Sequence, residues 1–350
     1  MSAKKQTLFV SDIHLGPGND WDWFDAEIEG PRMINFFEYV LKRQSDHDDI
    51  KEVVLLGDVF DLWVCPYDET PHKFDDIVIH HKEVIDSVKK MADKVRTFYV
   101  NGNHDYQVTN NNIHDAFDGK VRHIGEVYRR GNIHAEHGHN YALFNRPDPK
   151  NGGFSRLPLG YYITRLHTSL KQKRGSKSKL IIQAIDEAFQ MMGPEKLPES
   201  ILDALKDAVE MSDKARDVKH FNMGHISREQ KYDDVRERYR NLYDDWKESV
   251  GLWKSVQMIM CELNRLGTVA DQLCRNGVDI VIFGHSHDTK MDKDTFLVKD
   301  RIYANCGYWC GFGEDEDKDD NAHFVETDGR TVKLNWLKNG EAVLRKSLSL

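Results

Sequence analysis

The sequence predicts an α/β fold that is interrupted by a long helical insertion, and three observations support this prediction. Short runs of apolar, β-favouring residues recur near both ends of the 350-residue chain, and each run ends in a polar cluster. Segments with helical periodicity lie between these runs. From about residue 155 to residue 276 the chain changes to long helical stretches in which no strand is obvious. We therefore expect a core formed by residues 1–154 and 277–350, with residues 155–276 inserted as a helical cap.

The strands of the predicted core follow one another along the chain. The first begins with Leu8, Phe9 and Val10, which are apolar and favour strands. Near the end of the chain, Asp328 and Gly329 stand between two alternating runs, which predicts a β-hairpin. Helical patterns at residues 32–44 and 74–94 separate the early strands. Further strand-like runs occur at residues 52–61, 95–105, 131–140, 278–288 and 301–309.

The predicted cap contains four stretches with a helical pattern, at residues 178–192, 198–212, 227–250 and 252–266. Ser227 is followed three residues later by Gln230, which is the spacing of a helix N-cap and its N3 partner. We therefore expect the third of these helices to begin at Ser227.

The composition narrows the class of protein. The formal net charge of −9 argues against a generally basic protein that coats nucleic acid, although it is compatible with a local basic patch. No run approaches the roughly 18 apolar residues of a membrane-spanning helix, and the apolar run before Ser11 is shorter than the core of a secretory signal. The five cysteines form no CxxC pair, which is typical of reduced thiols. We expect a soluble, cytoplasmic protein with no transmembrane segment.

Five of the predicted strands end in side chains of the kinds that bind metal ions. Asp12 and His14 follow the first strand, and residues two apart in an extended segment point to the same side. Open α/β sheets gather their sites at the carboxyl ends of strands, and burying many such side chains together is costly without a cation. We therefore predict a metal site there. Its other candidates are Asp58, Asp61, Asn103, His104, Asp105, His137, His139, His285 and His287.

The number and type of these side chains indicate two metal ions. A mixture of oxygen and imidazole ligands suits Mn, Fe, Zn or Ni better than calcium. Seven ligands are more than the six that one octahedral ion binds. Two neighbouring ions also need a group that bridges them, and a carboxylate is suited to this role. Two ions about 3.5–4 Å apart would hold a phosphoryl oxygen and lower the pKa of a shared water towards 7. This chemistry predicts hydrolysis of a phosphate ester.

Five motifs now resemble those of a known family. "SDIHLG", "GDVFD", "GNHD", "HGH" and "GHSH" occur in this order and are similar to the motifs of the calcineurin-like metallophosphoesterases. The resemblance covers residues of about 7–140 and 278–310. It implies two packed β-sheets flanked by helices, an αββα sandwich, with the metals at the strand ends and the helical insertion above them. It also implies two divalent metal ions, of which Mn²⁺ is our first expectation and Fe, Zn and Ni the alternatives.

The resemblance assigns a role to each motif residue. Asp12, His14 and His287 would hold the first metal, and the second would be held by Asn103, His137 and His285. Asp58 would bridge the two ions, and the attacking group would be a hydroxide shared by them.

The same resemblance places two catalytic residues beside the metals. His104 would contact the substrate and protonate the leaving oxygen, and Asp105 would orient its imidazole. Asp61 is expected to support the ligands rather than to bind metal. In "HGH" the family pattern makes His137 the ligand, so His139 is expected to support it or to face the substrate.

Two further segments narrow the resemblance. "GDVFDLW", which contains Trp63, and "YANCGYW" are similar to the branch that contains the UDP-2,3-diacylglucosamine hydrolases, which cleave a pyrophosphate bond. Those hydrolases usually have arginine where this chain has His104, which places the sequence closer to the general phosphoesterase pattern.

A basic segment lies at the start of the insertion. Residues 149–185 contain no Asp or Glu, although the whole chain is acidic. Beside a metal site this segment would bind a polyanion, namely a nucleotide diphosphate, a nucleic-acid backbone or an anionic lipid surface. The alternative is a solvated basic loop. Our candidates for substrate contacts within it are Arg165, Lys171, Lys173 and Arg174.

The sequence therefore predicts a dinuclear metal-dependent phosphoesterase that cleaves a phosphodiester or pyrophosphate bond in a small, nucleotide-like substrate. The alternatives are a nuclease that resembles DNA-repair nucleases, in which nucleic acid is the partner, and a phosphomonoesterase. A non-catalytic scaffold with this fold is disfavoured, because all seven ligand positions and His104 are present. The sequence does not indicate the oligomeric state.

Overall fold

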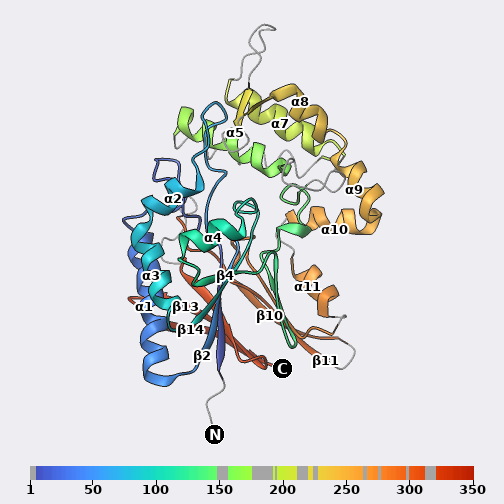
Figure 1. Ribbon diagram of the computed structural model, residues 1–350. Helices are drawn as coiled ribbons and strands as arrows, with labels where there is room; N and C mark the ends of the chain where they lie inside the picture. The colour runs from blue at the N-terminus through green and yellow to red at the C-terminus, as the bar shows by residue number, and fades with distance from the viewer. Residues whose placement is uncertain are drawn as a thin grey trace.

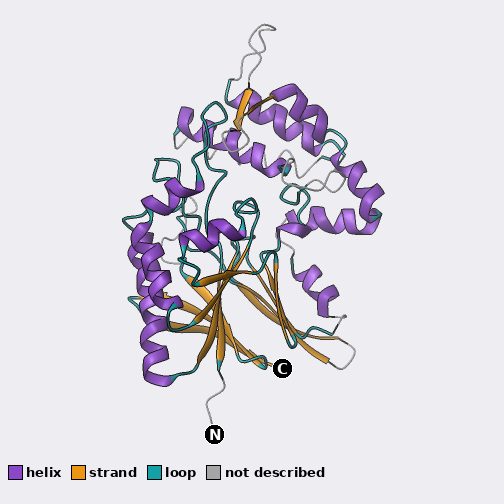
Figure 2. Ribbon diagram, in the orientation of Figure 1, coloured by secondary structure: helices purple, strands orange, loops and turns teal. Residues whose placement is uncertain are grey.

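Two β-sheets pack against each other and helices cover their outer faces, as a computed structural model shows (Figure 1; Figure 2). The structure describes residues 5–147, 157–175, 192–193, 195–210, 220–223, 228–262, 266–274, 277–296, 299–311 and 321–350. This arrangement confirms the predicted two-sheet fold with flanking helices. None of the described helices is long and apolar enough to cross a membrane.

The first sheet has seven strands, and β1, β2, β3 and β4, which run from its middle to one edge, are parallel. The three strands on the other side of β1 are antiparallel to their neighbours, and β12 and β13 form the hairpin predicted at Asp328–Gly329. In sheet order the strands are β14 (Glu341–Ser349), β13 (Thr331–Lys338), β12 (His323–Thr327), β1 (Gln6–Val10), β2 (Ile50–Leu56), β3 (Arg96–Val100) and β4 (Val121–His123).

The second sheet has five strands, in which β9 lies between two parallel neighbours and the edge strands are antiparallel. In sheet order they are β10 (Lys290–Phe296), β11 (Lys299–Asn305), β9 (Ile280–Phe283), β6 (Ile133–Glu136) and β5 (Val127–Arg130). Every predicted strand is present but shorter than its sequence run, because the last residues of each run lie in a loop.

Alternation along the strands divides the core into layers. Leu8 and Val10 of β1 face the helices, whereas Phe9 faces the second sheet and packs with residues such as Ile282. The outer face of the second sheet is covered by α11 (Gly267–Cys274), whose Val269 packs with Val281. The helices on the first sheet are α1 (Glu29–His47), α2 (Phe74–His80), α3 (Lys82–Ala92) and α4 (Asn110–Ala116).

The inserted segment forms a cap above the strand ends, at the top of Figure 1. Its elements are α5 (Leu159–Arg174), α7 (Leu197–Ala208), β7 (His220–Met223), β8 (Arg228–Lys231), α8 (Tyr232–Tyr239), α9 (Leu242–Val250) and α10 (Leu252–Glu262). It has an apolar core of its own, which includes the buried Trp246. Trp63 and Tyr67 extend into that core from the loop after β2 and join the cap to the sheets.

Two expectations about the cap are wrong. The sequence showed no strand there, yet β7 and β8 form a short antiparallel hairpin. Gln230 lies in β8 rather than in the first turn of a helix, and α8 begins only at Tyr232. Ser227 and most of the helix expected at residues 178–192 lie outside the described residues. The predicted start fails because residues 228–231 pair with residues 220–223 as strands before the helix begins.

Candidate metal centre

The predicted ligands lie in the loops after β1, β2, β3, β6 and β9, at one edge of the two sheets. We expected Asp12 and His14 to point the same way because they alternate along a strand. That reason is wrong, since β1 ends at Val10 and both residues have positive φ, 56° and 57°. Asp12 Oδ1 nevertheless lies 4.0 Å from His14 Nε2. A turn, rather than strand geometry, therefore brings the two side chains together.

Glycines allow the loops to approach one another closely. Gly57 has a φ of 85°, and a Cβ atom there would overlap the ring of His137. A Cβ atom at Gly102 would overlap the carboxylate of Asp58. The glycines of "GDVFD" and "GNHD" are therefore required by the packing of the predicted ligands.

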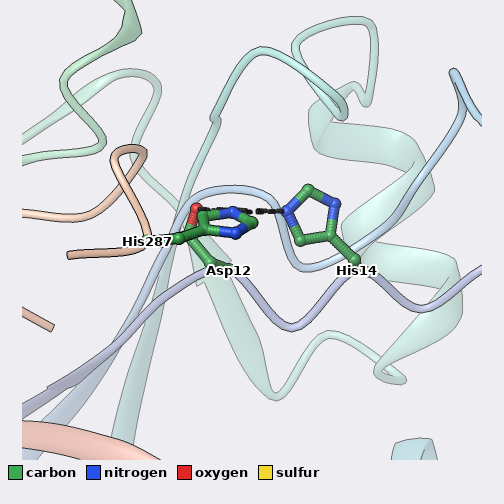
Figure 3. A group of neighbouring side chains, drawn as sticks. All are labelled: Asp12, His14 and His287. Atoms are coloured by element: carbon green, nitrogen blue, oxygen red, sulfur yellow. Dashed lines mark hydrogen bonds and ion pairs between the residues drawn. The ribbon is translucent and has the colours of Figure 1, made fainter. Parts of the chain in front are cut away.

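Asp12, His14 and His287 form the first cluster (Figure 3). His287 Nε2 lies 3.2 Å from Asp12 Oδ1 and 3.2 Å from His14 Nε2. Asp12 and His14 are completely buried. Their three ligand atoms face a common point, although the residues come from opposite ends of the sequence.

Asp58, His137 and His285 form the second cluster. His137 Nε2 lies 3.1 Å from Asp58 Oδ2 and 3.1 Å from Asn103 Oδ1. The same Asp58 oxygen lies 3.7 Å from His14 Nε2 in the first cluster. Asp58 is therefore placed between the two groups, as a bridging carboxylate would be.

The donor set fits divalent cations. His14 Nδ1 lies 2.9 Å from Asp61 Oδ2, so a proton on Nδ1 leaves a lone pair on Nε2. That lone pair faces His287 Nε2, and a cation between the nitrogens would satisfy both. Buried carboxylates, imidazoles and an amide oxygen within contact distance are the ligands that Mn, Fe, Zn and Ni accept.

The charges of the two clusters act on one another. Burial raises the pKa of Asp12, but His137 and His287 more than offset this and hold the pKa at about 2. Burial lowers the pKa of His137, and the carboxylates of Asp58 and Asp12 outweigh burial and raise it to about 9. The site thus concentrates negative charge that needs a positive partner.

His104 lies beside the clusters, but the structure corrects the identity of its partner. Its Nδ1 is 3.0 Å from Asp61 Oδ1, whereas the carboxylate of Asp105 accepts hydrogen bonds from Tyr99 Oη, Gly102 N and Val59 N. The prediction that Asp105 orients His104 is therefore wrong. Asp105 instead holds the turn after β3 against the turn after β2, and Asp61 contacts both His14 and His104.

Aromatic rings surround these histidines, and the sequence analysis missed most of them. Trp63 stacks on His104 with ring centroids 4.3 Å apart and an angle of 28° between the planes. Trp23 contacts His104 and His14, with centroid distances of 5.1 and 4.7 Å. Tyr308 stacks on His287. Trp63 and Tyr308 stood in the segments "GDVFDLW" and "YANCGYW" that the sequence analysis used, whereas the "DWDWF" segment that contains Trp23 resembled an ordinary loop.

His139 lies against the second cluster. Its ring centroid is 5.6 Å from that of His137 and 6.5 Å from that of His285, and the side chain is buried. Burial is the largest cause that lowers its pKa, and the neighbouring His137, His285 and Arg146 lower it further. Arg146, which the sequence analysis did not single out, therefore belongs to the surroundings of this histidine.

Arg165, the first of the basic candidates, binds the loop after β2. The guanidinium of Arg165 is buried and donates to the backbone carbonyls of Cys65, Pro66 and Glu69 at 2.7, 2.7 and 2.6 Å. Arg165 is therefore a structural clamp on the loop after β2, and the expectation that it contacts substrate is wrong.

The other basic candidates differ in position. Lys173 donates to Val209 O at 2.7 Å, and Arg174 pairs with Glu210. Burial raises the pKa of Asp22, in the loop that also carries Trp23, and the charge of Lys171 opposes this as a minor cause. The remaining basic residues of the segment, Lys150, Arg156, Lys177 and Lys179, lie outside the described residues.

Comparison with solved structures gives matches of low similarity. A Vps29 mutant from Entamoeba histolytica shares 13% identity over 99% of both chains with a TM-score of 0.35. A predicted phosphoesterase from Streptococcus pneumoniae shares 12% over 99% of both chains with a TM-score of 0.32. A 5'-nucleotidase precursor from Thermus thermophilus shares 10% over 99% of this chain and 54% of its own, with a TM-score of 0.36. At these values a likeness does not indicate a shared activity.

Comparison with families gives a direct result. No curated protein matches the chain. The profile of the family described as "Calcineurin-like phosphoesterase" matches residues 5–289, which include all five motifs. This family uses divalent metals. The chain belongs to the calcineurin-like phosphoesterase family.

Proposed function

We propose that this protein is a dinuclear metal-dependent phosphoesterase that hydrolyses a phosphodiester or pyrophosphate bond in a nucleotide-like substrate. The position of Asp58 carries the proposal. One of its oxygens lies 3.1 Å from His137 in one cluster and 3.7 Å from His14 in the other. A carboxylate shared by two buried histidine clusters is suited to two ions and not to one.

The residues divide into two ligand sets around Asp58. Asp12, His14 and His287 would hold the first ion, and Asn103, His137 and His285 the second. Divalent cations held there would polarise the phosphoryl group and supply an activated water. We keep Mn²⁺ as the first choice, with Fe, Zn and Ni as alternatives.

His104 would give a proton to the leaving oxygen. Asp61 accepts from its Nδ1 and leaves Nε2 for exchange with the substrate. Burial lowers the pKa of His104, but the carboxylates of Asp61 and Asp58 raise it overall, which favours the protonated form that an acid needs. Trp63 packs on the ring and restricts its rotation.

The complete ligand set and the held His104 support an enzyme rather than a scaffold. The pyrophosphate chemistry of the branch that shares "GDVFDLW" stays part of the proposal, as does the cytoplasmic location. Support for that branch comes from Trp63, which contacts the proposed acid His104. The long cap shares no motif with the branch.

The experiment compares hydrolysis of bis-p-nitrophenyl phosphate with hydrolysis of p-nitrophenyl phosphate. The protein is stripped with a chelator and each divalent metal is then added back. We expect metal-dependent cleavage that is faster for the diester. Faster cleavage of the monoester would identify a phosphatase instead, and cleavage that survives chelation would overturn the metal assignment.

A further inference from the structure

The imidazole of His139 is buried without hydrogen bonds. The side chain is 1% exposed, and neither Nδ1 nor Nε2 has a hydrogen-bond partner among the described residues. A buried polar group that stays unpaired costs about 1–3 kcal/mol. Because the ring lies against His137 and His285, a partner for His139 would come from whatever binds beside the second cluster.

Arg146 is the second group without a matching partner. Its guanidinium lies over the ring of the buried Trp246, 4.6 Å from the ring centroid, and the residue is partly buried. Among the described residues, no carboxylate lies within ion-pair distance of this guanidinium. The nearby Glu126 accepts a hydrogen bond from Asn140 instead. Stacking on an indole holds a guanidinium in place but leaves its N–H groups free to bind an anion.

One short segment connects the two residues to the metal centre. Gly138 O accepts from Tyr141 N and His139 O accepts from Ala142 N, which forms a tight turn. A second turn follows, in which Ala142 O accepts from Arg146 N. Within this second turn, Asn145 Oδ1 accepts a hydrogen bond from the side chain of Asn103, a predicted ligand, at 3.3 Å. The segment that carries both unpaired groups is thus fixed directly to the second cluster.

We propose that Arg146 and His139 form an anion-binding subsite beside the second metal position, and that it holds the non-scissile phosphate of a pyrophosphate-linked nucleotide. The assignment rests on the proposed phosphoesterase function. Neighbouring phosphates in a pyrophosphate share one oxygen, so a scissile phosphate at the clusters places the second phosphate next to them. A guanidinium binds two phosphate oxygens at once, and an imidazole N–H adds a third hydrogen bond.

The subsite makes a distinction between substrates that the clusters alone do not make. A simple diester has one phosphate and leaves the subsite empty, whereas a nucleoside diphosphate derivative fills it. The subsite also supplies positive charge without the basic cap residues, of which Arg165, Lys173 and Arg174 are occupied by other contacts.

The test compares Arg146→Met with the unaltered protein on two substrates, UDP-glucose and bis-p-nitrophenyl phosphate. Methionine keeps a long apolar side chain on Trp246 and removes the charge. We expect kcat/KM for UDP-glucose to fall about 10- to 100-fold, the range of a hydrogen bond to a charged group. The value for bis-p-nitrophenyl phosphate should change less than about threefold. Equal losses on both substrates, or no loss on UDP-glucose, would overturn the subsite.

Arg345→Met is the matched control, because Arg345 lies over Trp336 at 4.5 Å in the same stacked arrangement, on β14. It should leave both activities unchanged. Arg146→Lys keeps the charge and should retain part of the UDP-glucose activity, so a folding defect in the methionine variant would be recognised. An effect of Arg146→Met on a single-stranded oligonucleotide larger than on UDP-glucose would overturn the pyrophosphate assignment in favour of a polynucleotide.

A binding measurement separates this proposal from the proposed function. Calorimetry with AMP and ADP needs no turnover, and the two ligands differ by one phosphate. We expect ADP to bind at least tenfold more tightly than AMP, and Arg146→Met to remove the difference. If the unaltered protein hydrolyses nothing but shows this preference, the enzyme proposal fails and the subsite stands. If ADP and AMP bind equally, the subsite fails whatever the activity.

Discussion

The metal centre and the cap use charged side chains in opposite ways. In the metal centre, carboxylates and imidazoles are buried with their ligand atoms facing one another, at 3.1 and 3.2 Å in the closest pairs. In the cap, the buried guanidinium of Arg165 is turned towards backbone carbonyls, and Arg174 forms an exposed pair. The first arrangement costs stability unless a ligand binds, and the second stabilises the fold by itself.

This difference shows when a sequence pattern indicates function. A run of basic residues satisfies many structural needs, so its composition does not distinguish a clamp from a substrate contact. Aspartate and histidine at five strand ends satisfy few structural needs, so their coincidence is informative. Four substitutions and one comparison variant, Arg174→Met, test these regions, and they are given from the largest expected effect to the smallest.

Asp58→Asn tests whether the two clusters depend on one shared carboxylate. The amide has no charge to offer two cations, so we expect hydrolysis to fall by about 10³-fold or more and the bound metal to drop. Metal analysis and diester hydrolysis measure both effects. The circular dichroism spectrum of the metal-free variant should match that of the metal-free parent. Full activity in a properly folded variant would remove Asp58 from the centre.

His104→Ala separates catalysis from metal binding within the same centre. We expect kcat to fall about 10²- to 10⁴-fold, the usual contribution of an acid that protonates a leaving group. Metal content should be unchanged, because Asp61 holds Nδ1 of the ring and both ligand sets stay complete without His104, although His104 also lies within ligand distance of His14 and Asp58. Loss of metal together with activity would mean that His104 is a ligand instead.

Arg165→Met tests the cap. Several backbone carbonyls of residues 65–69 would lose their donor at once, so we expect the free energy of unfolding to fall by about 3 kcal/mol. Arg174→Met should change it by less than about 0.5 kcal/mol, because that pair is exposed. Urea unfolding measures both. Equal effects would show that burial does not separate these two arginines.

His81→Gln tests the loop between β1 and α1, which carries Asp12 and His14 and which His81 contacts at Gly16. Burial lowers the pKa of His81 to about 4, with His80 as a further cause, and its Nε2 bonds to Gly16 O. In the unfolded chain the pKa of His81 is near 6.5. As the pH falls, the unfolded state therefore binds a proton on His81 before the folded state does. The contribution of His81 to stability is present above pH 6.5 and is lost as the pH falls towards 4.

We accordingly expect the parent protein to lose about 2 kcal/mol more stability than His81→Gln between pH 7 and pH 4.5. Urea unfolding at the two pH values gives this difference. The other buried histidines titrate in both proteins, so their contributions cancel in the comparison. An identical pH dependence in the two proteins would show that His81 is not held neutral.

The core was predicted well because the sequence signals for strands and turns are local. Short runs of apolar, β-favouring residues gave the strands, and the Asp328–Gly329 turn gave the hairpin. The motif residues were found by type and order, and the structure brings them into two clusters. The family resemblance added the two-sheet arrangement, which strand patterns do not contain.

The remaining features depend on contacts between distant segments. The choice between Asp61 and Asp105 as partner of His104 is made by the packing of two turns, and both residues stand in equally plausible motifs. Arg146 and Trp246 are a hundred residues apart, and neither lies in a recognisable motif. The β7–β8 hairpin carries too few apolar residues to show a strand period.

The left-handed turns at the metal centre limit which side chains these positions accept. Aspartate, asparagine and histidine tolerate positive φ, whereas β-branched residues do so at a clear cost. A ligand replaced by asparagine thus changes the chemistry and keeps the backbone, whereas valine changes both. Variation at these sites should therefore be narrower than metal chemistry alone would require. The residues concerned are Asp12, His14, Asp58, His285 and His287.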